Sequence, residues 1–351
     1  MEAGRTKAAA ATTTTTTKRL ATLVGCNYAG TPNELRGCIN DVLAMRDTLV
    51  GRFGFAPRDV AVLTDHRGAA VPPTGANIKR ALADMVARAA PGDVLFFHYS
   101  GHGTLVPARH GRHGRDQDEA IVPCDFNLIT DVDFRELVDR VPRGASFTMV
   151  SDSCHSGGLI DQEKEQIGPS VDGDGDGDDD DDAAPPVPPP RARFLPYAVV
   201  LGHLSGASGV DASHHVGDHL LALFGADASA KFRRRPGHHH DAAPPDAGIL
   251  LSGCQWDETS ADVAEGDDDA VGGGKACGAF SAALQAVLRA HPAPLSNREV
   301  VARARAALRD QSFEQHPCLY CSDANAAAPF LCQQQPEKEE EAAAAAVHAM
   351  L

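Results

Sequence analysis

Apolar and polar positions alternate along the chain in blocks that predict strands and helices in turn. The run LATLVGCNY at 20–28 is apolar until its last residues, which is typical of a buried strand. The next block has apolar residues at helical spacing, which predicts an amphipathic helix; they are Leu35, Cys38, Ile39, Val42, Met45 and Leu49. Further strands are expected at 59–65, 92–103, 119–125 and 145–153, and further helices at 77–89 and 133–141. This alternation predicts an α/β fold, with a mostly parallel central sheet and helices on both faces.

The pattern breaks between 161 and 246. An acidic run, Pro-rich stretches and RRRPGHHHDAAPPD follow one another there. Such segments bury too little apolar surface to offset the entropy of ordering, so a long disordered linker is expected. One apolar island inside it, from FLPYAVVLGHL to HLLALFGA (194–226), can form short helices.

Regular structure is expected to resume with a buried strand at 247–255. Helices at 278–291 and 296–311 follow, and Ser296 and Glu299 form a capping box for the second. One strand is too few for a separate sheet, so both structured regions are expected to share one. The expected divisions are a disordered 1–18, a large region at 19–165, the linker at 166–246, a small region at 247–332 and a low-complexity tail at 333–351.

Charge and cysteine content narrow the function classes. The net charge of the 351-residue chain is −16, and residues 161–182 carry nine Asp and two Glu against one Lys, a local net of −10. Such an acidic chain is a poor candidate for binding nucleic acid. No apolar leader is visible in residues 1–20 and no run of 18 apolar residues occurs, so neither secretion nor a membrane span is expected. Nine cysteines then indicate free thiols in the cytoplasm or nucleus. The N-terminus reads equally as low complexity or as a loose match to a transit peptide.

Three metal-like motifs lack the ligands they need. Asp172, Asp174, Asp176 and Gly177 open like an EF-hand loop, but Ala183 stands where a bidentate Glu is required. The HHH run at 238–240 has no partner at zinc spacing. The single CxxC at 318–321 is half a zinc site, so structural cysteines are the better interpretation.

Dense polar chemistry follows two of the expected strands, in HYSGHG (98–103) and SDSCHSGG (151–158). Parallel strands deliver their carboxyl ends to one edge of a sheet, so His102 and Cys154 can meet there. A thiol nucleophile needs such a base, and the N–H groups of Gly103 and Cys154 can stabilise the oxyanion of acyl transfer. Adjacent side chains diverge, so His155 is given a structural role.

These motifs, with GCNY…LRGCINDV, IVPCD and LLSGCQ…TSAD…GAFS, resemble those of plant metacaspases, which are caspase-fold cysteine peptidases. The resemblance covers about 20–165 and 247–332, and the long acidic linker is similar to that of the type II class. It implies a caspase-like three-layer sandwich, a monomer, a His102–Cys154 dyad, and protein or peptide substrates with Arg or Lys at P1, the position before the cut. The alternative is a catalytically silent caspase-like scaffold that binds partners.

The resemblance also implies a specificity pocket, S1, formed by Asp41, Ser100 and Asp152. A buried carboxylate beside the nucleophile would pair with a cationic P1 side chain.

Calcium (Ca²⁺) activation is a further implication of the resemblance. The matching carboxylates are Asp118, Asp131 and Asp161, and oxygen ligands of this kind suit a weak calcium site. Val132 replaces the middle acid of the family's usual run, so calcium should bind more weakly or Asp133 must compensate.

The resemblance also implies a zymogen that cuts its own linker after a basic residue. The matching position is Lys231 in GADASAKFRRR, with Arg233 to Arg235 as alternatives. A linker lysine that plugs a pocket made for Lys or Arg would inhibit the enzyme until it is cut.

Overall fold

A seven-stranded sheet forms the centre of the molecule. The computed structural model describes residues 17–112, 115–160, 164–168, 190–210, 213–233, 248–255, 258–266 and 274–332. In spatial order the strands are β2 (Val60–Thr64), β1 (Arg19–Gly25), β3 (Val94–Ser100), β7 (Ser146–Asp152), β10 (Ile249–Ser252), β13 (Cys318–Tyr320) and β8 (Glu165–Ile167). The first five are parallel, and β13 and β8 each run antiparallel to the strand before them.

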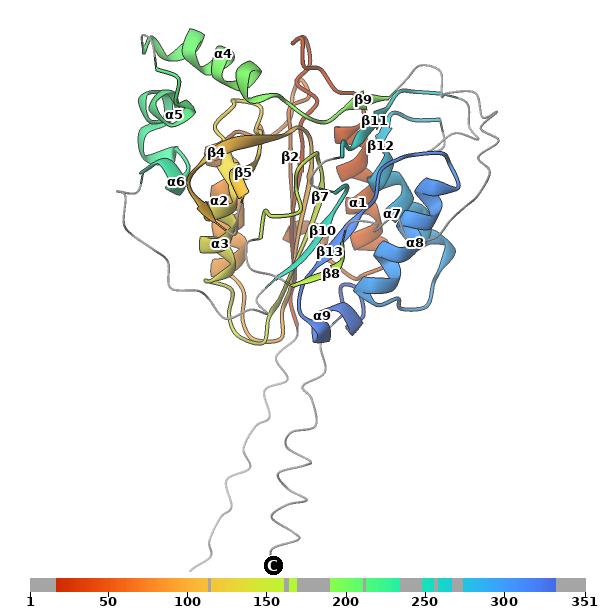
Figure 1. Cartoon of the computed structure of the whole chain (residues 1–351). Coiled ribbons are helices and arrows are strands. Elements are labelled where there is room, and N and C mark those ends of the chain that lie inside the picture. The colour runs from red at the N-terminus through yellow and green to blue at the C-terminus, as the bar shows by residue number, and fades with distance from the viewer. Residues whose placement is uncertain are drawn as a thin grey trace, which may run out of the picture.

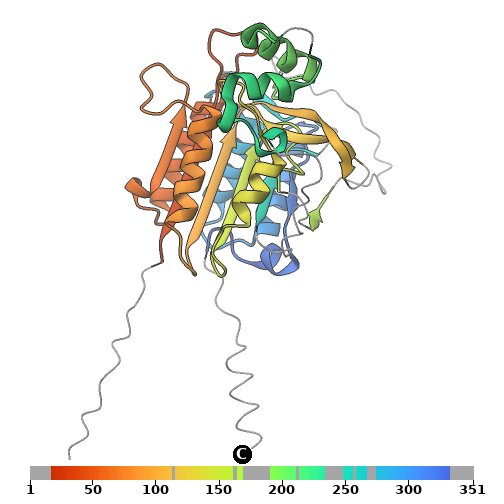
Figure 2. The ribbon, with the colours of Figure 1, turned by 90° about the vertical axis from the view of Figure 1, so that its left-hand side faces the viewer.

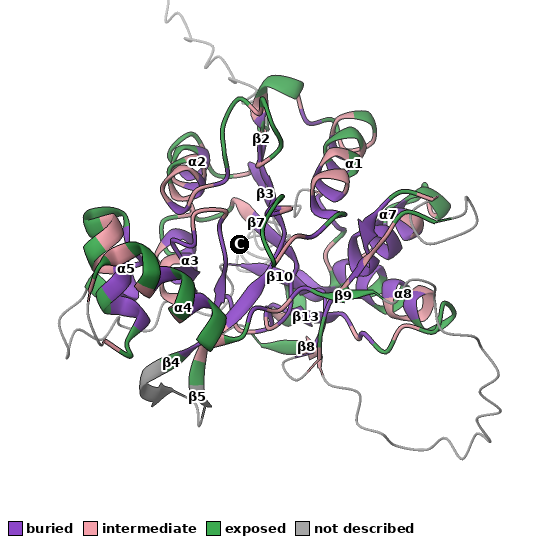
Figure 3. Cartoon of the chain, turned by 90° about the horizontal axis from the view of Figure 1, so that it is seen from above, coloured by how far each residue is buried: buried purple, intermediate pink, exposed green. Residues whose placement is uncertain are grey.

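Helices cover both faces of this sheet, which completes the expected three layers. Figures 1 and 3 show α2 and α3 on one side and α1, α7 and α8 on the other. Their bounds are α1 (Cys38–Gly51), α2 (Gly75–Ala87), α3 (Asp131–Val138), α7 (Ala279–Ala290) and α8 (Asn297–Arg309), with the short η1 (Pro57–Asp59) and α9 (Asp323–Ala327) at the periphery.

Strand β1 shows why the central strands are mostly apolar. Leu20 and Val24 pack in the core on one side of the sheet, whereas Ala21 and Leu23 pack in the core on the other. Successive side chains of a strand point to opposite faces, so a strand covered on both faces is apolar at most positions. The one polar side chain inside β1, Thr22, is also buried.

The sheet is shared by both structured regions, as predicted. Strand β10 lies between β7 and β13, so the segment after the linker enters the middle of the sheet. Strand β13 contains Cys318 of the CxxC pair, and Cys318 and Cys321 are buried free thiols.

Two small antiparallel sheets were not anticipated. One contains β4 (Gly103–Arg112), β5 (Arg115–Ile121) and β6 (Ile129–Thr130), so the strand expected at 119–125 is part of a hairpin outside the central sheet. The other contains β9 (Arg191–Ala192), β11 (Ala261–Val263) and β12 (Cys277–Gly278). Figure 1 shows this second sheet above the carboxyl ends of the parallel strands.

Part of the predicted linker is folded. Helices α4 (Tyr197–Ser208) and α5 (Val216–Phe224) lie within the expected apolar island, followed by η2 (Gly225–Asp227) and α6 (Ala230–Arg233). They gather above α2 and α3 (Figure 2) because Val200, Leu204, Leu220 and Phe232 join the core on that side. The acidic run, the HHH motif and both termini lie outside the described residues. In the described part of the chain, no helix combines the length and apolarity that crossing a bilayer requires.

Candidate active site

His102 and Cys154 emerge from neighbouring strands at one edge of the sheet. The register of β3 with β7 pairs Ser100 with Asp152 at its last step. Each candidate lies two residues beyond its member of that pair. The parallel pairing therefore delivers the two groups to the same place, although they are far apart in sequence.

The Cys154 thiol is buried against the segment that leads into β11. The Ser260 N–H donates to its Sγ at 3.0 Å, and Sγ lies 3.8 Å from the Ser260 carbonyl. Gly103 is required beside it, because a Cβ on this residue would lie 2.0 Å from the Cys154 carbonyl oxygen. The backbone of β4 thus approaches the nucleophile as closely as a glycine allows.

The His102 imidazole is held in a neutral form with a defined tautomer. Its Nε2 donates to the Asn33 carbonyl at 2.8 Å, and its ring lies 4.8 Å from the ring of Tyr28, centroid to centroid. Burial lowers the pKa of His102 to about 4. Its Nδ1 has no hydrogen-bond partner among the described residues, so that atom carries a lone pair able to accept a proton.

The linker passes through this site as an extended strand. Ala192 and Arg191 of β9 pair antiparallel with β11. The Arg193 N–H donates to the Ser260 carbonyl at 2.9 Å, and the Leu195 N–H donates to the Gly103 carbonyl at 2.9 Å. An extended backbone held on both sides is how proteins commonly bind a peptide segment.

The carbonyl of Arg193 lies where an oxyanion would develop. Its oxygen accepts the N–H of Gly103 at 2.9 Å and the N–H of Cys154 at 3.4 Å. These are the two groups expected from the sequence to form an oxyanion hole. The Arg193–Phe194 peptide bond therefore lies at the nucleophile.

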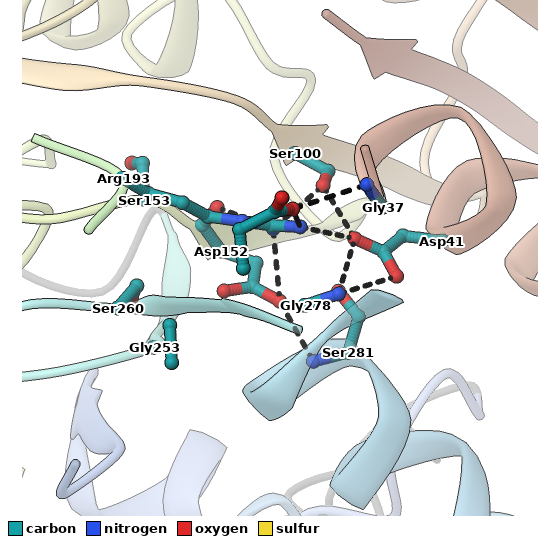
Figure 4. Close-up of polar contacts among 12 residues, drawn as sticks. Gly37, Asp41, Ser100, Asp152, Ser153, Arg193, Gly253, Ser260, Gly278 and Ser281 are labelled. Carbon is teal, nitrogen blue, oxygen red and sulfur yellow. Dashed lines mark hydrogen bonds and ion pairs between the residues drawn. The ribbon is translucent and has the colours of Figure 1, made fainter. Parts of the chain in front are cut away.

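The side chain of Arg193 fills an acidic pocket (Figure 4). Its Nη2 lies 2.9 Å from both Asp41 Oδ2 and Asp262 Oδ1, and its Nη1 lies 3.2 Å from Asp152 Oδ2. Nη1 also donates to the Ser100 hydroxyl at 2.8 Å, and that hydroxyl donates to Asp41 at 2.7 Å. The three side chains of the predicted pocket and that of Arg193 are all buried. The structure therefore brings Asp41, Ser100 and Asp152 together around a cation.

Burial controls the ionisation of this cluster. Burial raises the pKa of Asp41 to about 7, with the Arg193 guanidinium acting against that rise. Burial also disfavours the charge of Arg193, but Asp152, Asp41 and Asp262 together outweigh it and raise its pKa. The guanidinium stays protonated, and three carboxylates surround it.

Gly278 provides the room for the guanidinium. A Cβ at this position would lie 2.1 Å from Asp152 Oδ2 and 2.4 Å from Arg193 Nη1. The Gly278 N–H also donates to Asp41 at 2.9 Å. Any side chain here would fill the pocket.

Two residues of this arrangement were not identified from the sequence. Asp262, in TSAD, also accepts the N–H groups of Arg36 at 2.8 Å and Gly37 at 3.1 Å, so it ties the pocket to the loop before α1. Its place inside a quoted family motif was the available signal. Arg193 had none, because one arginine in a low-complexity linker resembles any other.

Lys231, the expected occupant of the pocket, lies elsewhere. Its ammonium forms an ion pair with Asp118, and the neighbouring Ala230 N–H donates to Asp133 at 2.9 Å. Asp133 also accepts the Thr130 N–H at 3.0 Å and so caps α3. Helix α6 therefore engages Asp118, which the resemblance assigned to calcium, and Asp133, which was expected to compensate for Val132.

The described carboxylates do not fit a calcium site in this conformation. Calcium takes six to eight oxygen ligands. Among the described residues, no group of three or more His, Cys, Asp or Glu side chains is arranged to hold a metal ion. Asp131 is buried on α3, and Asp161 lies outside the described residues.

His155 contacts the linker next to the nucleophile. Its φ of 51° lies in the left-handed region, so the backbone at His155 no longer follows the extended path of β7. Its ring packs edge-on against Phe194, with 4.7 Å between centroids. Phe194 directly follows Arg193, so this contact gives His155 a supporting role beside the linker.

Comparison with known proteins identifies the family. A family model described as "Caspase domain" matches residues 18–328. Metacaspase-9 of Arabidopsis thaliana is 55% identical over 326 residues, which is 90% of this chain and 97% of that protein. Metacaspase-6 of the same plant is 38% identical and covers 89% of this chain and 99% of its own length.

The fold comparison agrees at the level of architecture. The crystal structure of protein GSU0716 from Geobacter sulfurreducens matches with a TM-score of 0.59 and 19% identity. It covers 91% of this chain and all of its own. The chain belongs to the caspase-domain family, and within it this protein is a type II metacaspase, a cysteine-type endopeptidase.

Proposed function

We propose that this metacaspase cleaves after arginine or lysine and is made as a zymogen that cuts its own linker between Arg193 and Phe194. The observation that carries the proposal is that Arg193 is bound at two places, by its side chain and by its carbonyl group. Its guanidinium is paired with Asp41, Asp152 and Asp262, and its carbonyl accepts from Gly103 and Cys154. The pocket that binds the Arg193 side chain therefore also sets its carbonyl group at the donors that would stabilise the transition state.

The proposed reaction is acyl transfer through a thioester. The Cys154 sulfur attacks the carbonyl carbon of Arg193, and His102 takes the thiol proton at Nδ1. The N–H groups of Gly103 and Cys154 stabilise the oxyanion, a contribution of about 10²–10³ in rate for one such donor. His102 returns the proton to the Phe194 nitrogen as the C–N bond breaks. Water then hydrolyses the thioester and releases the new carboxyl group of Arg193.

Basic specificity follows from the charges in the pocket. Three buried carboxylates require a cation, and a planar guanidinium can pair with more than one of them. An apolar or acidic side chain would leave them without a counter-charge, at a cost of several kcal/mol. We therefore place the linker cut after Arg193, and not after Lys231 as the sequence match suggested.

Incubation of the purified full-length protein tests this proposal. We expect a fragment whose N-terminal residue is Phe194, identified by mass spectrometry. That cut should be lost in Cys154→Ala and Arg193→Gln and retained in the matched variant Lys231→Met. A peptide reporter with Arg at P1 should be cleaved, and one with Asp should not. A first cut after Lys231, or the same cut in Cys154→Ala, would overturn the assignment.

Calcium dependence stays a prediction of the family resemblance. If calcium activates the enzyme, the rate of the Arg193 cut should rise between a chelator and millimolar calcium. Since α6 engages Asp118 and Asp133, the measurement should be repeated with Lys231→Met. An equal rate with and without calcium, in both proteins, would remove calcium from the mechanism.

A further inference from the structure

A second cysteine reaches the same edge of the sheet as Cys154. Strand β10 runs parallel to β7, and their register pairs Ser252 with Ser151 at its last step. The Gly253 N–H continues the ladder by donating to the Ser151 carbonyl at 2.8 Å. Cys254 lies two residues beyond the end of β10, just as Cys154 lies two residues beyond the end of β7.

Cys254 contacts the segment that carries Cys154. Its Sγ lies 3.7 Å from the carbonyl oxygen of Ser153, the residue before Cys154, and 3.6 Å from the carbonyl of Glu258. The Cys154 side chain is also the largest cause of the raised pKa of the Cys254 thiol, so the two groups interact. Both cysteines are free and fully buried. The β7–β10 register, carried on by two residues, sets Cys254 level with Ser153, one residue from Cys154. Strands about 4.8 Å apart keep residues offset by one position within the range over which a disulfide can form.

We propose that Cys154 and Cys254 form a reversible disulfide when the active enzyme meets hydrogen peroxide. The Cys154 thiolate attacks one peroxide oxygen, the O–O bond breaks and hydroxide leaves, so Cys154 becomes a sulfenic acid. The Cys254 thiol then gives up its proton, and its sulfur attacks the Cys154 sulfur. The S–O bond breaks and water leaves. The two thiols supply the two electrons that reduce one peroxide to two waters.

The environments of the two thiols assign the order of these steps. Interaction with the Cys154 side chain, followed by burial, raises the pKa of Cys254, so Cys254 reacts poorly with peroxide by itself. Cys154 is the residue whose proton His102 can take under the proposed function, on which this inference rests. In the uncut chain the Arg193 carbonyl accepts the Cys154 N–H. Oxidation is therefore expected mainly in the cut enzyme.

The disulfide would protect the nucleophile as well as silence it. A sulfenic acid without a nearby thiol proceeds to sulfinic acid, which thiol reductants do not reverse. With Cys254 alongside, the oxidised enzyme stops at a disulfide that thiol exchange can open.

Peroxide treatment of the self-cleaved enzyme tests the pair. We expect lost peptidase activity that dithiothreitol largely restores. Non-reducing mass spectrometry should find the peptides of Cys154 and Cys254 linked. Cys254→Ala and Cys254→Ser should lose activity with at least tenfold less recovery, each relative to its own untreated activity. Cys332→Ala, a control at a half-buried thiol, should behave as the wild type.

The outcomes separate this inference from the proposed function. An enzyme that is active, is inactivated by peroxide and yields no Cys154–Cys254 peptide overturns the inference alone. Recovery of both Cys254 variants to the wild-type level does the same. Retained activity in Cys154→Ala would instead overturn the proposed function, and the linked peptide would still report on whether the two thiols pair.

Discussion

Arg193 is a fully buried cation among three carboxylates, and each carboxylate has a backbone N–H as a further partner. Gly278 donates to Asp41, Ser281 to Asp152 and Arg36 to Asp262. These donors keep the acids in place when no guanidinium is present. The pocket is therefore organised before a substrate arrives, which lowers the cost of binding a basic side chain.

Asp262→Asn should weaken the binding of basic P1 residues. A hydrogen bond to a charged group contributes about 1.5–3 kcal/mol, so KM for an Arg-P1 peptide should rise by about tenfold to a hundredfold. Asp262 does not contact the Arg193 carbonyl, so kcat should change little. Steady-state kinetics of the cut enzyme measure both values. Asp47→Asn, at an exposed ion pair, is the control, and an unchanged KM in Asp262→Asn would contradict the assignment.

Two buried histidines should make the fold sensitive to acid. Burial, followed by Arg193, lowers the pKa of His98 to about 3, and burial lowers that of His102 to about 4. Below pH 6.5 these two histidines bind protons in the unfolded chain but stay neutral in the folded protein. Stability should therefore fall as pH drops from 6.5 towards 4, by up to about 1.4 kcal/mol per pH unit for each histidine.

Urea unfolding of Cys154→Ala, which cannot cut itself, measures this dependence. His98→Gln in that background should lose less stability between pH 6.5 and 4.5, by up to about 2 kcal/mol. His214→Gln, at an exposed histidine, should follow the parent. The same pH slope in all three proteins would show that His98 does not carry the effect.

At the scale of elements, the linker is attached at two separate places. β9 and the residues after it pair with β11 and with the start of β4. Helices α4 to α6 pack on the core above α2 and α3. The proposed cut after Arg193 divides the first attachment, with β9 on one fragment and Leu195 on the other. The fragment that begins at Phe194 still has Leu195 buried and paired with Gly103.

Lys231→Met should loosen the second attachment. It removes the ammonium from Asp118, whose side chain is only 19% exposed. Leaving that charge without its partner should favour local opening, and amide hydrogen exchange across α5 and α6 should speed up by about tenfold or more. The strands of the central sheet should be unaffected. Lys164→Met, at a surface pair with Asp323, is the control, and equal exchange in both variants would contradict the role of Lys231.

At the scale of the whole molecule, the two regions form one folded unit. β10 lies between β7 and β13, and both faces of the sheet bury residues from each side of the linker. The large region by itself would expose the edge of β7, which is a template for aggregation.

The proposed cut after Arg193 should therefore leave the two fragments associated in one particle. The cut enzyme should elute at the position of the uncut chain in size-exclusion chromatography and give a single mass by native mass spectrometry. The fragments should separate only in denaturant, because their contact is a shared core. Separate fragments in native buffer would contradict the shared sheet.

The parallel sheet, its covering helices and the arrival of His102 and Cys154 at the ends of neighbouring strands could all be predicted from the sequence. These follow from local periodicity and from the rule that parallel strands deliver their ends to one edge. The pocket residues Asp41, Ser100 and Asp152 came from the family resemblance. Which linker cation enters the pocket is seen only in the folded structure. Arg193 and Lys231 are both basic residues in irregular segments, and their roles depend on where β9 and α6 dock. Such docking is set by contacts between residues remote in sequence, which no local pattern records.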